Sequence, residues 1–475
     1  MLLLLACKPQ VEPFPESFRF GVATAGFQVE AGCPTLEPSR CEDRASDWYQ
    51  WVTDEELLAE SSLHLSGDPL SLAPGHYELY EQDLGLAAEG LGVSMFRFSF
   101  EWSRLFPDGE AEQATTVDEL YQHVDADAMA WYHGYLGAMV EHELEPVATV
   151  NHYTLPLWVH DGKACHADPE SCTASGWLDG ERMLPLIELF SGFVALEYGE
   201  YIQLWMTLNE PIAVVLSGYL FPNPERTNPP GISDATMGLT VAWNMARAHA
   251  RMADAIRAQD SDAEVGVVVN VGVVKPQNPD DPEDIRAAEH MDYIYNQLIL
   301  DAFLEGRMDM NLDGRVDTED PNVAGKTDWL GLNYYFGFKV VGFVSPLPGF
   351  TDFPYVDFFP VEMDTDPALL ADAIDITAAR GLPVYITENG VADPEAEDAV
   401  AFLDPSLRVV RQAAYDHDLR GYMYWSLMDN YEWNHGMGMV FGLYGVDTQT
   451  KERTLRPIGE RYRTIVSDHG FAVLD

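Results

Sequence analysis

Hydrophobic patterns typical of strands and of helices alternate along almost the whole chain. Short runs rich in β-branched and aromatic side chains predict eight buried strands, at residues 18–25, 93–100, 145–152, 202–208, 265–271, 329–334, 383–387 and 421–427. Stretches with helical periodicity follow them, at residues 77–90, 127–143, 183–197, 236–257, 284–304, 367–380, 399–415 and 457–466. Eight strand-then-helix units predict one α/β domain over residues 11–475, a single (β/α)8 TIM barrel with long insertions in the loops that follow the strands.

Two of the predicted strands lead directly into a glutamate. Residues 383–387 run into the motif ENG, which begins with Glu388, and residues 202–208 run into NEP, which contains Glu210. An isolated glutamate before a turn is as often a turn cap as a functional group. The C-terminal ends of parallel barrel strands meet at one mouth, however, so both carboxylates would face one substrate. Such a pair is what glycoside hydrolysis needs, with one carboxylate as nucleophile and the other as acid/base.

Polar and aromatic residues accompany most of the other strand ends. In chain order they are Gln28, Arg97, Asn151, His152, Tyr153, Asn333, Tyr334, Tyr335 and Trp425. Amides, imidazole and carboxylates bond sugar hydroxyl groups, and flat aromatic rings cover the apolar faces of a pyranose. A lone histidine is more often structural, but the setting of His152 among other polar strand ends favours a functional role.

Seven ordered motifs resemble those of one enzyme family. They are FRFGVATAGFQVE, FRFSFEWSRLFP, NHYTLPLW, TLNEP, LGLNYY, YITENG and YWSLMDNYEWNHG. They span residues 18–465, nearly the whole chain, and resemble glycoside hydrolase family 1, the retaining β-glucosidases and β-galactosidases. The resemblance implies that catalysis needs no metal or organic cofactor.

The resemblance also implies a role for each residue of the site. Glu388 is similar to the family's nucleophile and Glu210 to its acid/base. Arg97 and Tyr335 resemble the groups that bond the nucleophile and keep it ionised and aimed. The expected substrate contacts are Gln28, His152, Asn209, Tyr335, Trp425, Glu432 and Trp433, with Trp425 as the stacking platform and Trp433 beside it.

The expected activity is hydrolysis of small-molecule β-glycosides by double displacement, with retention of configuration. Terminal non-reducing β-D-glucosyl residues are the expected substrate, together with β-D-galactosyl and fucosyl residues. A transglycosylase with the same two steps is one alternative. A non-catalytic sugar-binding lipoprotein is the other, and it would be favoured by loss of either carboxylate, but Glu210 and Glu388 are both present.

Three positions qualify the resemblance. Tyr153 stands where many bacterial members have Trp, and Val440 where a basic residue usually stands. Glu432 would repel a phosphate group, so it argues for unphosphorylated sugars. The two departures, at Tyr153 and Val440, concern the outer wall of the sugar site and are expected to leave the chemistry untouched.

The charge balance excludes some partners. The chain has 27 Lys and Arg against 78 Asp and Glu, a formal net charge of −51. Such a chain repels nucleic acid and anionic membrane surfaces and attracts cations. We therefore expect no nucleic-acid partner.

The first ten residues, MLLLLACKPQ, resemble the end of a bacterial lipoprotein signal. A small residue there precedes Cys7, the candidate for a lipid anchor. Residues 1–10 are therefore interpreted as the remnant of a signal or tether, and the protein as exported to the periplasm or cell surface. A short apolar tail is the alternative.

The other four cysteines form two close pairs in loop-like stretches. In an exported protein they predict two local disulfides, one between Cys33 and Cys41 and one between Cys165 and Cys172. A metal site is the competing interpretation, but neither spacing is C-x-x-C, and His166 alone does not complete a zinc site.

Residues 309–320, DMNLDGRVDTED, follow the pattern of a calcium-binding loop. Acidic or amide side chains occupy positions 1, 3, 5, 9 and 12, with Gly at 6 for the sharp turn and an apolar residue at 8. The predicted ligands of one structural Ca²⁺ are Asp309, Asn311, Asp313, Asp317, Asp320 and the carbonyl oxygen of Arg315. The alternative is one more solvated acidic loop in a highly acidic chain.

Overall fold

The computed structural model describes residues 12–392 and 397–473. The predicted tether at residues 1–10, with its anchor candidate Cys7, lies outside this part of the chain. Among the described residues, no helix is both long and apolar enough to cross a bilayer.

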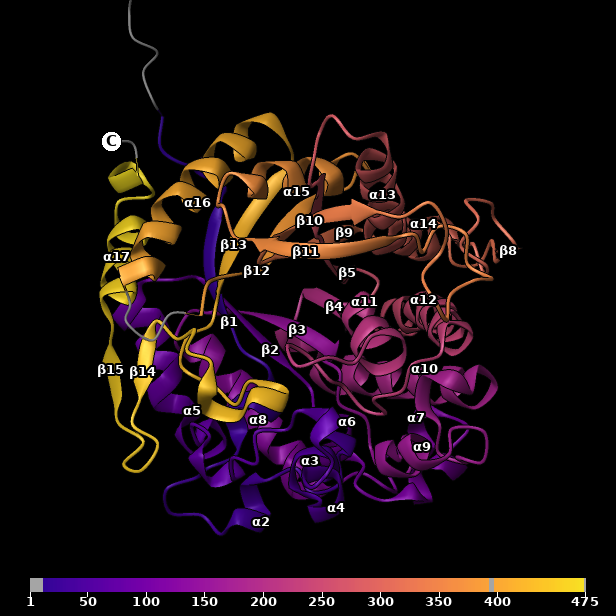
Figure 1. Cartoon of the computed structure of the whole chain (residues 1–475). Coiled ribbons are helices and arrows are strands. Elements are labelled where there is room, and N and C mark those ends of the chain that lie inside the picture. Colours follow the sequence, from indigo (N-terminus) through magenta and orange to yellow (C-terminus); the bar gives the residue numbers. More distant parts are fainter. Residues whose placement is uncertain (1–11, 393–396, 474–475) are drawn as a thin grey trace, which may run out of the picture.

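Eight parallel strands close into a barrel (Figure 1). They are β1 (Arg19–Ala23), β2 (Met95–Ser99), β3 (Glu145–Asn151), β4 (Leu204–Asn209), β5 (Glu264–Asn270), β9 (Trp329–Tyr334), β12 (Val384–Asn389) and β13 (Leu419–Trp425). Closure occurs at β1, which pairs with both β2 and β13. The prediction of a single (β/α)8 barrel is confirmed.

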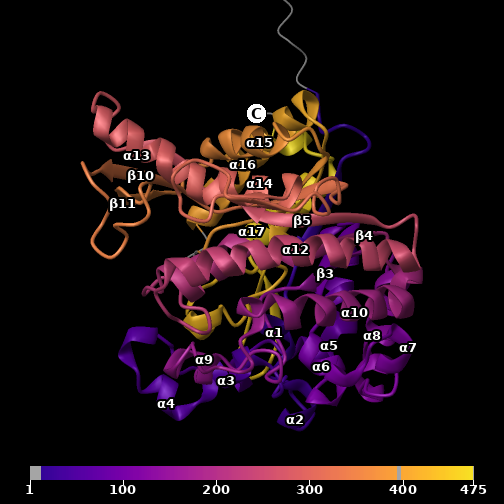
Figure 2. The same ribbon diagram turned by 90° about the vertical axis from the view of Figure 1, so that its right-hand side faces the viewer.

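Helices surround the barrel, and the longest follow its strands. The main ones are α5 (His76–Gly85), α8 (Ala126–Glu141), α10 (Gly180–Tyr198), α12 (Ala235–Gln259), α15 (Leu369–Ala378), α16 (Glu397–Asp416) and α17 (Pro457–Ser467). Figure 2 shows α10 and α12 running side by side along the barrel. Both begin at an aspartate, Asp179 or Asp234, whose side chain accepts a hydrogen bond from a backbone N–H of the first turn.

Short helices occupy the loops around the barrel. They are α1 (Gly26–Glu30), α2 (Pro38–Cys41), α3 (Asp47–Thr53), α4 (Glu55–Leu58), α6 (Trp102–Leu105), α7 (Val117–Leu120), α9 (Gly162–Ala167) and α11 (Pro211–Val215). The single helix predicted over residues 284–304 is divided into α13 (Pro282–Asp292) and α14 (Leu298–Glu305) by a π-helical turn. In that turn Asn296 donates a hydrogen bond to the carbonyl oxygen of Gly272, in the link that follows β5, a contact that hydrophobic periodicity does not reveal.

The hydrophobic core has two parts. One fills the barrel with the inward side chains of its strands, among them Met95, Val147, Met206, Val268 and Met423. The other lies between the barrel and its helices and contains most of the remaining buried side chains. This division follows from the alternation of side chains along each strand. Side chains therefore fill the interior of the barrel, so a substrate could bind only at one of its ends.

The aromatic and proline-rich insertion after the sixth barrel strand is partly ordered into strands. β10 (Gly337–Gly342) lies between β6 (Val273–Pro276) and β11 (Phe358–Asp364) in a three-stranded sheet. Figure 2 shows this sheet and α13 standing out at one edge of the molecule. A small hairpin of β14 (Tyr444–Val446) and β15 (Arg453–Leu455) follows β13. β6 and β10 directly follow the barrel strands β5 and β9, so the three-stranded sheet begins at the C-terminal ends of these two strands.

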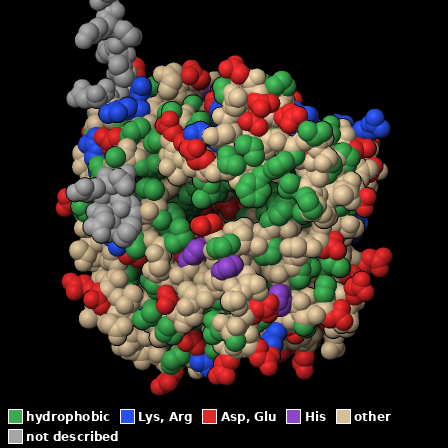
Figure 3. Space-filling model, in the orientation of Figure 1, with side chains coloured by type: hydrophobic (Ala, Val, Ile, Leu, Met, Phe, Trp, Pro, Cys, Tyr) green, Lys and Arg blue, Asp and Glu red, His purple; other side chains and the backbone are tan. Residues whose placement is uncertain are grey.

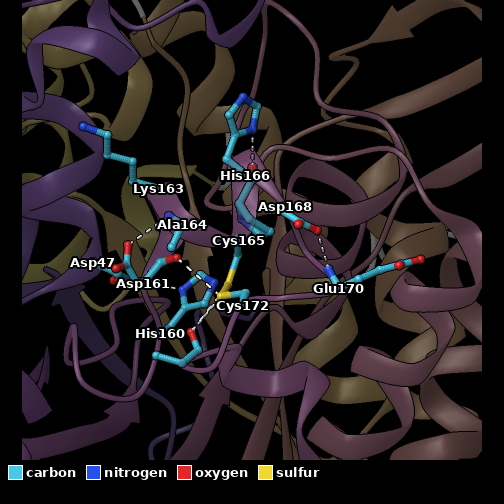
Figure 4. The surroundings of a disulfide bond; sticks show 12 residues. Asp47, His160, Asp161, Lys163, Ala164, Cys165, His166, Asp168, Glu170 and Cys172 are labelled. Atoms are coloured by element: carbon cyan, nitrogen blue, oxygen red, sulfur yellow. Dashed lines mark hydrogen bonds and ion pairs between the residues drawn. A yellow bond between two sulfur atoms is a disulfide. The ribbon is translucent and has the colours of Figure 1, made fainter.

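Only one of the two predicted disulfides is present. Cys165 and Cys172 are bonded at the end of α9, with a Cα–Cα distance of 4.9 Å (Figure 4). Cys33 and Cys41 are free, so the prediction of a second disulfide is wrong in this structure. The backbone N–H of Cys33 donates to Sγ of Cys41 at 3.3 Å. A hydrogen bond from Cys33 lowers the pKa of the Cys41 thiol to about 7, so the two sulfur atoms interact without a covalent bond.

The acidic loop lies between α14 and β9, on the N-terminal side of the barrel. The hairpin of β7 (Arg307–Met308) and β8 (Thr318–Glu319) closes it, and Gly314 makes the predicted turn with φ of 83°. The buried carboxylate of Asp309 accepts hydrogen bonds from three backbone N–H groups of the loop. Within residues 12–392 and 397–473, no three His, Cys, Asp or Glu side chains are grouped closely enough to hold a metal ion.

Candidate active site

The two predicted glutamates lie at the C-terminal ends of β12 and β4. The end of β12, which carries Glu388, passes close to β13, and a Cβ at Gly390 would lie 2.1 Å from the carbonyl oxygen of Trp425. Glu210 follows β4 with a left-handed backbone (φ 44°), immediately before α11. Both are buried, with exposed fractions of 4% for Glu388 and 6% for Glu210. Figure 3 shows a hollow at the centre of one face, with acidic side chains on its floor and hydrophobic side chains along much of its rim.

Glu388 is held by a cation and a phenol. The guanidinium of Arg97 forms a buried ion pair with Oε1, and the hydroxyl of Tyr335 donates to Oε2 at 2.5 Å. Burial raises the pKa of Glu388 to about 7, and the charge of Glu210 adds to the rise, while Arg97 and Tyr335 oppose it. Arg97 therefore favours the ionised form, as the sequence predicted, but burial outweighs it.

Glu210 is held by neutral donors. The hydroxyl of Tyr153 donates to Oε2 at 2.5 Å, and the amides of Asn333 and Asn270 donate to Oε1 at 2.7 and 3.1 Å. The hydroxyl of Tyr295 donates to Oδ1 of Asn270 at 2.7 Å, which turns the amide nitrogen of Asn270 toward Glu210. The structure thus gives the two carboxylates different surroundings.

Asn209 connects the two sides of the mouth. Its Oδ1 accepts from Nη2 of Arg97 at 2.6 Å and from Nδ2 of Asn333 at 3.1 Å, and its Nδ2 donates to Nε2 of His152 at 3.1 Å. Burial lowers the pKa of His152 far below its usual value, so the ring is neutral. Nδ1 of His152 is buried with no hydrogen-bond partner among the described residues. A sugar hydroxyl is a suitable partner for such a group.

Gln28 and Glu432 meet on another wall of the site. Nε2 of Gln28 donates to Oε2 of Glu432 at 2.7 Å, while Oε1 of Gln28 is buried and unpaired within the described part of the chain. Nη1 of Arg226 donates to Oε1 of Glu432 at 3.2 Å. Burial raises the pKa of Glu432, and Arg226 and Gln28 limit the rise.

The two predicted tryptophans form an aromatic wall with His152. The His152 ring lies 6.0 Å from Trp425 and 5.9 Å from Trp433, nearly parallel to both. Phe27 from α1 stacks on Trp433 at 5.8 Å. These contacts fix the ring planes, as a platform for a pyranose requires.

Every predicted substrate and nucleophile contact is therefore found at the mouth, but four contributors were not assigned from the sequence. Asn270 is the last residue of β5, and Asn333 lies one residue before the end of β9. Asn333 was named among the polar strand-end residues without a role, whereas Asn270 was not named, although an amide at a strand end was the available signal. Tyr153 was named as a polar strand-end residue and as a departure confined to the outer wall, but the structure places its hydroxyl on Glu210, so that confinement was wrong. Arg226 lies in a proline-rich loop before α12 and carries no signal that pattern analysis detects.

Known proteins resemble this chain along nearly its whole length. The β-galactosidase of Pyrococcus woesei is 29% identical, with 96% of this chain and 98% of that protein covered. A bifunctional β-D-glucosidase/β-D-fucosidase of Bifidobacterium breve is 28% identical, again over 96% and 98% of the two chains. The crystal structure of Fpglu1 from Fervidobacterium pennivoraus superposes with a TM-score of 0.85 at 26% identity, covering 96% of each chain.

A family profile gives the same assignment. The profile of glycosyl hydrolase family 1 matches residues 10–345 and 362–471. The matched ranges include both glutamates and every wall of the site described above. This chain belongs to glycosyl hydrolase family 1.

Proposed function

We propose that this chain is a retaining β-glycosidase that hydrolyses terminal non-reducing β-D-glucosyl residues, and also β-D-galactosyl and β-D-fucosyl residues. The observation that carries this proposal is the buried pair of Glu388 and Glu210, one held by a cation and the other by neutral donors. Membership of the family supports it, as do the glucosidase, galactosidase and fucosidase activities in the names of the relatives.

Glu388 acts as the nucleophile in the first step. Its ionised carboxylate attacks the anomeric carbon, and the bond from that carbon to the leaving oxygen breaks. Glu210 gives its proton to the leaving oxygen, so that the aglycone departs as a neutral alcohol. Arg97 and Tyr335 bond the two oxygens of Glu388 and keep the carboxylate aimed.

Water completes the reaction in the second step. Glu210, now ionised, takes a proton from water, whose oxygen attacks the anomeric carbon and releases Glu388. Two inversions give net retention. Gln28, His152, Asn209 and Glu432 would bond the sugar hydroxyl groups, and Trp425 and Trp433 would cover its apolar face.

NMR of the first-formed product tests the proposal. With an aryl β-D-glucoside the β-anomer should appear first and then mutarotate. An initial α-anomer would exclude the double displacement. A screen over aryl β-glycosides and cello-oligosaccharides would define the sugar and chain-length preference.

Neither alternative gains support from the site. A non-catalytic sugar receptor does not require two buried carboxylates with distinct proton-donor and cation contacts. A transglycosylase would use the same two carboxylates with a sugar as acceptor, and no described contact favours that acceptor over water. Product analysis at high substrate concentration would detect transfer products.

We also propose that the acidic loop binds one structural Ca²⁺ through Asp309, Asn311, Asp313, Asp317 and the carbonyl oxygen of Arg315. One feature supports it, and binding would have to draw together carboxylates that are not grouped as metal ligands among the described residues. Nδ2 of Asn311 donates to Asp317, while Oδ1 of Asn311 is inaccessible and has no partner in the described residues. The sixth predicted ligand, Asp320, pairs with Arg247 at 3.5 Å and would have to turn away from it.

Thermal unfolding tests the calcium proposal. Calcium should raise the melting temperature by a few degrees relative to chelator, because a ligand that binds only the folded state stabilises it by mass action. Asp313→Ala should remove the effect, while Asp262→Ala, an exposed acid elsewhere, should keep it. If chelation leaves the melting temperature unchanged, the proposal is wrong.

Export with a lipid anchor at Cys7 is a third proposal, supported by the sequence of residues 1–10 and by the Cys165–Cys172 bond. Protein from the native host should carry lipid on Cys7 in a mass spectrum. Its residues Cys165 and Cys172 should not react with thiol reagents. Reactive thiols at both positions would contradict export.

A further inference from the structure

Tyr153 makes the shortest contact to the acid/base carboxylate. Its hydroxyl lies 2.5 Å from Oε2 of Glu210, and only 6% of the residue is exposed. Its backbone is left-handed, with φ of 72°, a conformation that costs a non-glycine residue free energy and persists where the surroundings enforce it. The fold therefore holds this phenol against Glu210.

We propose that Tyr153 is a positioning residue for Glu210, whose hydroxyl fixes the carboxyl group and favours its ionised state. The inference rests on the proposed role of Glu210 as acid/base. A phenol that donates to a carboxylate stabilises the negative charge, because hydrogen bonds to ionised groups are stronger than those to neutral groups. Burial and the nearby Glu210 raise the pKa of Tyr153 well above its usual value, so the phenol keeps its proton and remains a donor.

Other elements hold Tyr153 in place. Its ring centre lies 5.0 Å from that of Trp433, and the guanidinium of Arg226 lies 5.3 Å from the Tyr153 ring and 5.4 Å from the Trp433 ring. Arg226 is itself paired with Glu432. The phenol is thus fixed by the same wall that would bind the sugar.

The groups that face Glu210 come from several elements. They are Tyr153 after β3, Asn270 on β5, Asn333 on β9, Tyr295 in the turn between α13 and α14, Glu388 on β12 and Tyr335 after β9. Burial raises the pKa values of the three tyrosines, so Glu388 is the one group among these six that titrates near neutral pH. Tyr153 is the one that donates to Oε2, while both amides donate to Oε1.

This arrangement has a consequence for each step. In the first step Glu210 must hold a proton, and a donor that favours the carboxylate makes Glu210 release this proton more readily to the leaving oxygen. In the second step Glu210 must be ionised to accept a proton from water, and the same hydrogen bond supports that state. Without the hydroxyl, the ionised carboxylate would lose its one donor to Oε2 and keep only the two amides on Oε1.

The test is the pH profile of kcat/KM for methyl β-glucoside, whose leaving group needs the proton of Glu210. In Tyr153→Phe the alkaline limb should move to higher pH by about one unit, from the loss of a hydrogen bond to a charged group. Tyr198→Phe is the matched control, because it removes a buried hydroxyl on α10 that donates to the carbonyl oxygen of Met129. Its limb should stay where it is in the wild type.

A second variant tests the same hydrogen bond in the opposite direction. Replacing Tyr153 by 3-fluorotyrosine strengthens the donor at nearly the same size, so the alkaline limb should move to lower pH. This substitution also remains informative if Tyr153→Phe folds poorly. A loss of rate at all pH values with unmoved limbs in both variants would overturn the inference and leave Tyr153 a packing residue. If the wild type itself fails to hydrolyse β-glycosides, the proposed function fails instead.

Discussion

The surroundings of Glu388 and Glu210 are alike on one side and different on the other. Each carboxylate is buried at the end of a barrel strand, and each accepts a hydrogen bond from a tyrosine hydroxyl at 2.5 Å. The second oxygen of Glu388 meets the guanidinium of Arg97, while that of Glu210 meets two neutral amides. Residue type and burial are therefore the same for the proposed nucleophile and the proposed acid/base. The difference between them is the charge of the group that donates to the second carboxylate oxygen.

A fixed cation and neutral amides differ in how strongly they favour the ionised form of a carboxylate. Arg97 interacts favourably with Glu388 chiefly when the carboxylate is ionised, as a nucleophile must be. Amides of Asn270 and Asn333 impose a smaller preference, so Glu210 can gain and lose a proton within one catalytic cycle. The two groups also influence each other, because the charge of Glu210 raises the pKa of Glu388 and protonation of Glu210 removes that effect.

Removal of the nucleophile should have the largest effect. Glu388→Ala should lower kcat by at least ~10⁴-fold with every leaving group, because covalent catalysis is lost. Added formate or azide should restore part of the activity with inverted product, which NMR would identify. Glu197→Gln is the control, since Glu197 is a partly buried glutamate on α10 that accepts hydrogen bonds from Tyr121 and His133 and contacts no residue of the site. If Glu388→Ala keeps substantial turnover, the assignment of the two roles must be reversed.

Loss of the acid/base should depend on the leaving group. Glu210→Gln should lower kcat/KM for methyl β-glucoside by ~10²–10⁴-fold, the usual contribution of general acid catalysis. For dinitrophenyl β-glucoside, whose leaving group needs no proton, kcat/KM should change far less. Equal losses on both substrates would remove the distinction between the two carboxylates.

The fold and the catalytic pair were predictable because both depend on local sequence patterns. Barrel strands are buried hydrophobic runs with β-branched residues, so β9 (Trp329–Tyr334) was predicted to the residue. The topology then places all strand ends at one mouth, which brings Glu210 and Glu388 together although 178 positions separate them in the sequence (388 − 210). The topology of the barrel was therefore enough to predict that the two glutamates lie close together, without knowledge of side-chain positions.

The remaining features depend on contacts that no periodic pattern records. Arg226 reaches Glu432 from an irregular loop, and its contact is set by tertiary packing. The Cys33 and Cys41 spacing allowed a disulfide, yet the sulfur atoms interact only by hydrogen bonding. The pKa of Glu388 likewise follows from complete burial, which outweighs the neighbouring cation that motif analysis identified.

A moderate effect is expected when the phenol beside the nucleophile is removed. With dinitrophenyl β-glucoside, the acidic limb of kcat/KM should reflect ionisation of Glu388, whose pKa is about 7. Tyr335→Phe removes a donor that favours the ionised form, so this pKa should rise and the limb should move to higher pH by about one unit. The rate would then be about tenfold lower on the acidic side and nearly normal at high pH. An unmoved acidic limb would contradict the role assigned to Tyr335.

The smallest effect should come from the amide side of Glu210. Asn270→Ala removes one of two neutral donors to Oε1, so kcat/KM for methyl β-glucoside should fall by only about threefold to tenfold, the loss of a single hydrogen bond. Tyr295→Phe should have a weaker effect in the same direction, because Tyr295 touches Oδ1 of Asn270 and acts through it.

A double-mutant cycle separates the two contributions. If Tyr295→Phe lowers the rate in the wild type but not in the Asn270→Ala background, the phenol serves only to orient the amide. If Tyr295→Phe lowers the rate equally in both backgrounds, Tyr295 does not act through Asn270. Tyr295 would then have to be counted with the two amides as a third neutral group that affects Glu210.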